Sequence, residues 1–182
     1  MPKIRSTTVL GVIHNGDVVI AADGQATLGA TVAKSNVKKV RRLMEGKILA
    51  GFAGSTSDAF TLLERLEEKL NMYRSNLRRA CIELAKDWRT DRYLRRLEAM
   101  LLVMDKDECL MISGSGDVIS PDHHVAAIGS GSNYALSAAL ALKKHAPKMT
   151  AKEIAIESMT IAADICIYTN HNFEVLELER KQ

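Results

Sequence analysis

The dipeptide Asn15-Gly16 lies between two apolar runs, residues 7–14 and 17–22, and constrains the fold more than any other feature. Both positions tolerate a positive φ, which a two-residue β-hairpin turn requires, so we predict an antiparallel hairpin. With His14 facing Asp17, Thr8 faces Asp23 and Thr7 faces Gly24. The hairpin therefore brings a carboxylate to the strand end at which Thr7 begins.

A second hairpin is predicted over residues 37–52, with its turn at Glu45-Gly46. In the simplest register Val40 faces Gly51, and Lys39 faces Phe52. Lys39 and the backbone of Gly51 should then be neighbours. Small residues dominate the segment that follows, residues 51–58, which indicates that the chain passes closely by another part of the molecule.

The rest of the chain separates into grouped helices and grouped strands. Ser57 is a predicted N-cap, and Thr150 with Glu153 forms a predicted capping box. No linker divides the chain, so we predict one α+β domain with sheet and helix layers. The predicted helices span about 57–70, 76–97, 133–145 and 150–163, and the further strands span 100–104, 109–112, 125–128 and 175–178.

Composition excludes several classes of protein. The net charge of +3 is too small to indicate nucleic-acid binding,. Cys81, Cys109 and Cys166 are odd in number and widely spaced, so they indicate buried reduced thiols rather than a disulfide framework or a zinc site,. The chain has no apolar run of membrane-spanning length, and its first residues lack the apolar region of a secretory signal, so we expect a cytoplasmic protein without a membrane partner.

The two hairpins bring together residue types that suit an N-terminal nucleophile. A threonine hydroxyl becomes nucleophilic when a base takes its proton, and the base can be its own α-amine if Thr7 is the first residue of the chain. A Lys39 cation would favour the neutral amine, and Asp23 would fix that cation. The Gly51 N–H could stabilise an oxyanion. Each residue also has an ordinary structural interpretation: β-propensity for Thr7, a turn for Asp23, an exposed strand edge for Lys39 and a tight loop for Gly51.

Several segments resemble one known family, the peptidase subunits of the bacterial HslUV protease, which are proteasome-like N-terminal nucleophile hydrolases. The resemblance runs from Thr7 almost to the C-terminus. The segments that carry it are residues 7–9, 23–29, 36–42, 50–54, 58–62, 84–89, 127–131 and 164–170.

The resemblance implies a role for individual residues. Thr7 matches the nucleophile, Asp23 and Lys39 match its charged supports, Gly51 matches the oxyanion N–H donor, and Ser130 matches a serine near the nucleophile. It also implies a sodium ion bound by backbone carbonyls. The positions that match the sodium ligands are Ala163, which stands where glycine is frequent, Cys166 and Thr169.

The resemblance further implies a four-layer αββα sandwich, in which two antiparallel sheets lie between helix layers. It implies a homo-oligomer, a double ring of hexamers with the active sites inside, and a hexameric ATPase partner, HslU, that delivers unfolded protein substrates. Independently of the resemblance, the chain has no GxxxxGK[ST] phosphate loop, so we expect no ATP site in it,.

Residues 1–6 form a leader that we expect to be removed, which leaves residues 7–182 as a single peptidase domain. We expect self-cleavage after Ser6, with Thr8 and Ser6 as rival nucleophiles. Two other functions remain open, a non-catalytic ring subunit of the same assembly and a small-molecule amidohydrolase. The histidines have no GxSxG elbow to complete a serine triad, so we expect surface or structural roles for them,.

Overall fold

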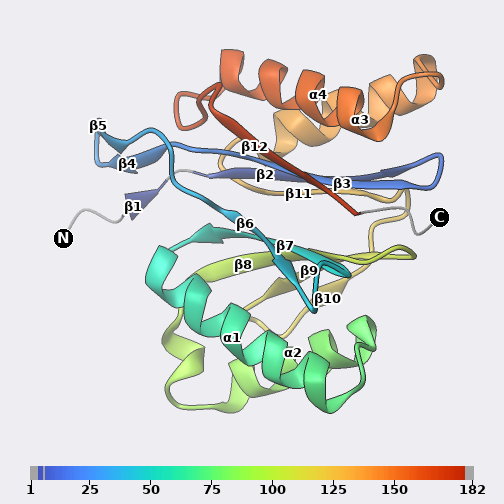
Figure 1. Cartoon of the computed structure of the whole chain (residues 1–182). Coiled ribbons are helices and arrows are strands. Elements are labelled where there is room, and N and C mark those ends of the chain that lie inside the picture. The colour runs from blue at the N-terminus through green and yellow to red at the C-terminus, as the bar shows by residue number, and fades with distance from the viewer. Residues whose placement is uncertain (1–3, 6, 179–182) are drawn as a thin grey trace.

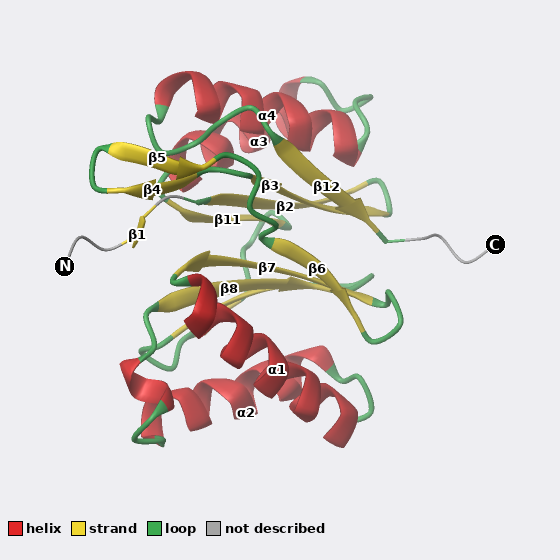
Figure 2. Ribbon diagram, turned by 60° about the vertical axis from the view of Figure 1, so that its left-hand side comes forward, coloured by secondary structure: helices red, strands yellow, loops and turns green. Residues whose placement is uncertain are grey.

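The computed structural model describes residues 4–5 and 7–178, of which residues 4–5 are described as backbone strand. Helices and sheets form four layers, with α3 and α4 on one outer face and α1 and α2 on the other (Figures 1 and 2). The predicted αββα sandwich is confirmed. The helices are α1 (Thr56–Met72), α2 (Leu77–Thr90), α3 (Ser132–His145) and α4 (Ala151–Ile165), with a short 3₁₀ helix η1 (Leu94–Arg96).

Two antiparallel sheets form the inner layers, and a smaller one lies beside them. One inner sheet has the order β11-β2-β3-β12 and the other the order β10-β9-β8-β7-β6; the small sheet has the order β1-β4-β5. The strands are β1 (Ile4–Arg5), β2 (Thr8–His14), β3 (Asp17–Asp23), β4 (Ala26–Leu28), β5 (Thr31–Lys34), β6 (Val40–Leu43), β7 (Ile48–Gly54), β8 (Ala99–Met104), β9 (Cys109–Ser113), β10 (Val118–Ile119), β11 (Val125–Gly129) and β12 (Phe173–Glu177).

The registers of both predicted hairpins are confirmed. In the first, the ladder runs from His14 opposite Asp17 to Val9 opposite Ala22. In the second, Val40 pairs with Gly51, and the Phe52 N–H donates to the Lys39 carbonyl at 3.1 Å. The two strand ends that carry the candidate chemistry are therefore fixed by turn geometry.

Three apolar clusters hold the layers together. One lies between α1, α2 and the five-stranded sheet, and its largest fully buried side chain is Trp88. A second lies between the two sheets and includes Val9, Ile20 and Leu102. The third packs α3 and α4 on the four-stranded sheet, where alanines such as Ala135 and Ala155 allow close approach. The described helices include none that is long and apolar enough to cross a membrane.

Two predicted helix boundaries are wrong. Helix α1 begins at Thr56. Its N-cap is Ser55 and not the predicted Ser57, because the Asp58 N–H donates to the Ser55 hydroxyl. The helix predicted over 76–97 ends at Thr90. There the Asp91 carboxylate accepts hydrogen bonds from two backbone amides that follow it and starts η1,. The capping box of Thr150 and Glu153 is confirmed.

The small sheet is absent from the sequence prediction. Strand β5 is exposed along its whole length, so it has none of the apolar alternation that marks a strand,. Strand β4 pairs with β5 on one side and, on the other, with two residues of the predicted leader: Ile4 lies opposite Leu28, and Arg5 opposite Thr27. The rest of the leader lies outside the described residues.

The cysteines behave as the sequence predicts. Cys81, Cys109 and Cys166 are free and buried. Burial raises the pKa of Cys81 and raises that of Cys109 to about 12, so both stay as neutral thiols at neutral pH,.

Candidate active site

Thr7 directly precedes β2, at the point where the chain passes from the leader into the four-stranded sheet. It is 4% exposed, and its carbonyl accepts a hydrogen bond of 2.7 Å from the Ser130 N–H. Gly129, opposite Thr8 in the ladder, has a φ of +96°, and a Cβ there would collide with the Thr7 carbonyl. A glycine is therefore required for this close approach. Ser130, predicted to lie near Thr7, does so through its backbone.

The Thr8 hydroxyl is already engaged in the fold. It accepts a hydrogen bond of 2.9 Å from the Gly131 N–H and lies 2.7 Å from the Thr169 hydroxyl oxygen. Thr8 is fully buried. Through these two contacts its hydroxyl links β2 to the start of α3 and to the turn after α4. A hydroxyl held in this way is a poor nucleophile, which favours Thr7 over Thr8.

The Asp23 carboxylate lies at the centre of the site. Oδ1 accepts from the Thr8 N–H at 2.8 Å and from the Lys39 ammonium at 3.0 Å. Oδ2 accepts from the Gln25 N–H at 2.9 Å and from the Asn170 N–H at 3.3 Å. A 1% exposed carboxylate is stable in this position because both oxygens are saturated with donors and one donor is a cation,.

Lys39 provides that cation from the residue just before β6. It is 2% exposed, and its ammonium also donates to the Gln25 carbonyl at 2.6 Å. Burial lowers the pKa of Lys39 below its ordinary value, and the attraction of the Asp23 carboxylate opposes that shift. The predicted pairing of Asp23 with Lys39 at the Thr7 end of the hairpin is therefore what the structure shows.

Gly51 lies inside β7, and its missing side chain is explained by packing. A Cβ at Gly51 would lie 2.6 Å from a methyl carbon of Val9 on the facing sheet. Hydrogen bonds alternate along an antiparallel strand. Since the Phe52 N–H donates toward β6 and the Ser55 N–H donates to Glu98 beside β8, the Gly51 N–H faces β8. This geometry does not support the predicted oxyanion role of Gly51.

The same alternation directs the Gly54 N–H to the other edge of β7, beyond the end of β6. Gly54 is exposed, has a φ of +114°, and is the last residue of the strand. An amide at this open edge can donate to a bound chain, whereas an amide between two strands cannot.

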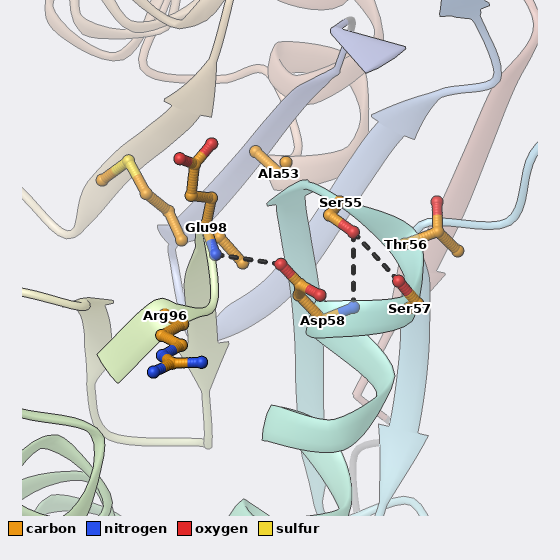
Figure 3. A pocket seen from close by; sticks show the side chains of 10 residues that line it. Ala53, Ser55, Thr56, Ser57, Asp58, Arg96 and Glu98 are labelled. Carbon is orange, nitrogen blue, oxygen red and sulfur yellow. Dashed lines mark hydrogen bonds between the residues drawn. The ribbon is translucent and has the colours of Figure 1, made fainter. Parts of the chain in front are cut away.

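A pocket of about 940 Å³ begins at this edge (Figure 3). Its wall includes Ala53, whose Cβ would lie 3.4 Å from a Cβ at Gly129, so the pocket adjoins the Thr7 carbonyl. The Asp58 carboxylate accepts from the Glu98 N–H at 3.0 Å and ties α1 to the chain before β8. The full lining is Ala53, Gly54, Ser55, Thr56, Ser57, Asp58, Arg96, Glu98, Ala99 and Met100.

The turn after α4 carries the predicted sodium ligands. The last backbone hydrogen bond of helix α4 runs from the Cys166 N–H to the Ala162 carbonyl, so the Ala163 carbonyl lies beyond the hydrogen bonds of the helix. Free carbonyls at a helix C-terminus carry partial negative charge, which suits a small cation. The Cys166 carbonyl accepts from the Thr169 N–H at 3.0 Å and keeps a second lone pair,. The arrangement fits a carbonyl-bound cation.

Two contributors to the site were missed by sequence reasoning, Gln25 and Asn170. Both bind Asp23 through backbone amides, and no side-chain pattern indicates such a contact. Asn170 lies 147 positions from Asp23, so only the fold reveals its place. The histidines lie elsewhere, as predicted: His14 contacts the Pro147 carbonyl, and His171 faces Asp164 at the surface.

Comparisons with known proteins agree with this geometry. Residues 4–178 match the Proteasome family of proteasome subunits. An "ATP-dependent protease subunit HslV" from Cytophaga hutchinsonii is 69% identical over 96% of this chain and 97% of its own length. One from Sulfurihydrogenibium sp. is 57% identical over 98% of this chain and 100% of its own. The crystal structure of eukaryotic HslV from Trypanosoma brucei superposes with a TM-score of 0.90 at 46% identity, covering 95% of this chain and 99% of the other.

Proposed function

This chain belongs to the proteasome subunit family, and from that premise we propose that it is the threonine-type endopeptidase subunit of a two-component, ATP-dependent protease of the HslV type. Its substrates are unfolded polypeptides that an ATPase partner delivers. The one observation that carries the chemistry is the shared Asp23 oxygen, which joins the Lys39 ammonium to the amide that follows Thr7.

The reaction begins with Thr7 as the first residue of the mature chain. Its hydroxyl attacks the carbonyl carbon of the substrate peptide bond, and its own α-amine takes the hydroxyl proton. The Lys39 charge favours the neutral form of that amine, which is the form that accepts a proton. The amine then donates the proton to the leaving nitrogen, so that an acyl ester on Thr7 and a free amine product are formed. Water hydrolyses the ester.

An amide at the end of β7 is the proposed oxyanion donor. Gly54 supports this role through its position at the open edge beside the pocket. Gly51 contributes by letting β7 approach Val9 and the start of β2. The Ser130 N–H holds the Thr7 carbonyl and so fixes the nucleophile from the other side.

The turn after α4 is the proposed sodium site, with the carbonyls of Ala163, Cys166 and Thr169 as ligands. A cation bound there would supply positive charge to these carbonyls. The same turn holds Thr169 against Thr8 and Asn170 against Asp23. Its role in this proposal is structural, because it orients residues that touch the site.

The assembly is proposed from the family. The chain forms a double ring of hexamers that encloses the active sites, and the HslU-type ATPase unfolds substrates and feeds them in. ATP hydrolysis is assigned to the partner because the sequence contains no GxxxxGK[ST] loop,. The cytoplasmic location stays a prediction.

Maturation is proposed to occur by self-cleavage after Ser6. Intact mass of the purified protein tests it: we expect a chain that starts at Thr7 and degrades an unfolded substrate with the ATPase partner and ATP. Thr7→Ala should keep the leader and lose activity, whereas Thr7→Ser should keep both cleavage and activity in part. A Thr7→Ala variant with full activity would overturn the assignment. The buried Asp23–Lys39 pair beside Thr7 favours this function over that of a non-catalytic ring subunit.

A further inference from the structure

Gln25 occupies the connection between β3 and β4 and is 6% exposed. Its side-chain amide donates to the Thr27 hydroxyl at 3.0 Å and to the Ile167 carbonyl at 2.9 Å. The second bond spans 142 positions of sequence and reaches the turn after α4. A buried side-chain amide that bridges two segments in this way restricts the position of the backbone that carries it.

The backbone of Gln25 contacts both charged groups of the site. Its N–H donates to Asp23 Oδ2 at 2.9 Å, and its carbonyl accepts from the Lys39 ammonium at 2.6 Å. The carbonyl distance is shorter than the 3.0 Å that separates the ammonium from the Asp23 carboxylate. The Gln25 carbonyl therefore helps, together with Asp23, to set the direction of the Lys39 ammonium.

The segment that receives the Gln25 side chain is itself bound to the site. Thr169 meets the Thr8 hydroxyl at 2.7 Å, and the Asn170 N–H reaches Asp23 Oδ2 at 3.3 Å. The Ile167 carbonyl lies between these contacts and the C-cap of α4 at Cys166. The Gln25 amide is thus a side-chain link between the turn after α4 and the peptide that holds Lys39.

We propose that Gln25 is a positioning residue for the peptidase reaction: by donating to the Ile167 carbonyl, its side chain fixes its own main-chain carbonyl, which aims the Lys39 ammonium at the Thr7 nitrogen. This inference rests on the proposed function. It predicts a loss of turnover without a loss of substrate binding, because Gln25 acts on Lys39 and not on the substrate.

The test compares Gln25→Met and Gln25→Glu with Thr27→Val in the assembled, processed enzyme with its ATPase partner. Both Gln25 variants lose the donor to Ile167 while keeping similar length. Thr27→Val removes one acceptor of the amide and leaves the Ile167 bond. We expect kcat to fall about 10- to 100-fold in both Gln25 variants, with KM within about twofold, and Thr27→Val to stay near wild type.

The pH profile separates positioning from a purely structural role. Loss of a well-placed carbonyl acceptor disfavours the charged ammonium, so the alkaline limb of kcat should move to lower pH in Gln25→Met. In Gln25→Glu the added carboxylate favours the charged ammonium and opposes that shift. A structural role would lower the melting temperature and leave that limb in place. A wild-type kcat together with a wild-type pH profile in both Gln25 variants would overturn the proposal. Loss of the folded ring in both Gln25 variants would also overturn it, since the Gln25 side-chain amide would then serve folding alone. An inactive wild-type enzyme would instead overturn the proposed function.

Discussion

The backbone amide of Thr8 donates to Asp23 Oδ1 at 2.8 Å, across the open end of the first hairpin. The same oxygen accepts the Lys39 ammonium at 3.0 Å. The carboxylate thus fixes the Lys39 ammonium relative to Thr8, the residue that follows the proposed nucleophile Thr7. A substitution that removes the charge of Asp23 and keeps its shape therefore tests the site more directly than one that changes the shape.

Asp23→Asn keeps an acceptor for the Thr8 N–H but leaves the Lys39 ammonium buried without a counter-charge. We expect peptidase activity to fall at least about 100-fold, a loss typical of a misplaced catalytic group. The free energy of unfolding should fall by about 3–5 kcal/mol, because a buried ion pair loses one partner. Urea denaturation at fixed protein concentration measures the second effect. Asp107→Asn, at the exposed pair with Lys106, is the control and should change stability by less than about 1 kcal/mol,. Equal effects of the two variants would contradict the assigned role of Asp23.

The pH dependence of kcat/KM should be bell-shaped. Activity rises as the α-amine of Thr7, with an ordinary pKa of about 7.7–8.0, loses its proton and can act as a base. It falls as Lys39 loses its charge, and burial lowers the pKa of Lys39, so this alkaline limb should lie below the ordinary lysine value of about 10.4,. Lys38→Met, at the exposed neighbouring position, should leave the profile unchanged. An alkaline limb at or above the ordinary value would contradict the lowered pKa of Lys39.

Thr8→Val separates the two adjacent threonines. The variant removes the hydroxyl that accepts from the Gly131 N–H and leaves that buried amide without its acceptor. We expect the free energy of unfolding to fall by about 1–3 kcal/mol, with cleavage after Ser6 and peptidase activity both retained. Thr8→Ser, which keeps the hydroxyl, should recover most of the stability. If Thr8→Val folded but lost all activity while Thr8→Ser was active, Thr8 would replace Thr7 as the nucleophile.

Gly51→Ala should strain the contact between the two sheets. A Cβ at Gly51 meets the methyl groups of Val9 and Ile20, both fully buried. Overpacking of this kind costs about 1–3 kcal/mol, which thermal unfolding would show as a lower melting temperature. The double variant Gly51→Ala with Val9→Ala makes room for the methyl group and should recover part of the loss. No change in melting temperature for Gly51→Ala alone would show that the sheets can separate at this point.

Replacing sodium by choline at equal ionic strength should lower activity and the melting temperature together. In the proposed site, removing sodium would leave the Ala163, Cys166 and Thr169 carbonyls without their counter-charge, and the turn that carries them also makes the contacts to Thr8 and Asp23. Differential scanning fluorimetry in the two salts measures the stability effect independently of catalysis. Identical melting curves and activities would exclude a functional sodium site at this turn.

The hairpins could be predicted from the sequence because short turns fix register by local chemistry. Asn15-Gly16 determined that Asp23 reaches the Thr7 end, and Glu45-Gly46 placed Lys39 beside β7. The contacts that the turn after α4 makes with Asp23 and Gln25 could not be predicted. Asn170 and Ile167 reach the site only after four layers have packed, and their contacts to Asp23 and Gln25 are made by backbone groups that every residue has.

A second limit on prediction from the sequence is the direction in which a single backbone N–H points. Sequence reasoning placed Gly51 beside Lys39 correctly, yet whether an N–H faces a substrate depends on strand alternation, which needs both neighbours of β7. Those neighbours are β6 and β8, and β8 is separated from β7 in sequence by α1, α2 and η1. The amide that faces the open edge belongs to Gly54, three residues later.

The pairing of β1 with β4 has a consequence for solubility. While the leader is attached, Ile4 and Arg5 cover one side of β4, opposite Leu28 and Thr27. The proposed removal of the leader would uncover the N–H and C=O groups on that side, and open strand edges of this kind are sites at which proteins aggregate. A subunit that matures before ring closure would present this edge to other chains in bulk solution. In the proposed ring, maturation after closure would uncover the edge among assembled subunits rather than in bulk solution. The order of the two events would then decide whether the uncovered strand aggregates or can pair with an incoming polypeptide.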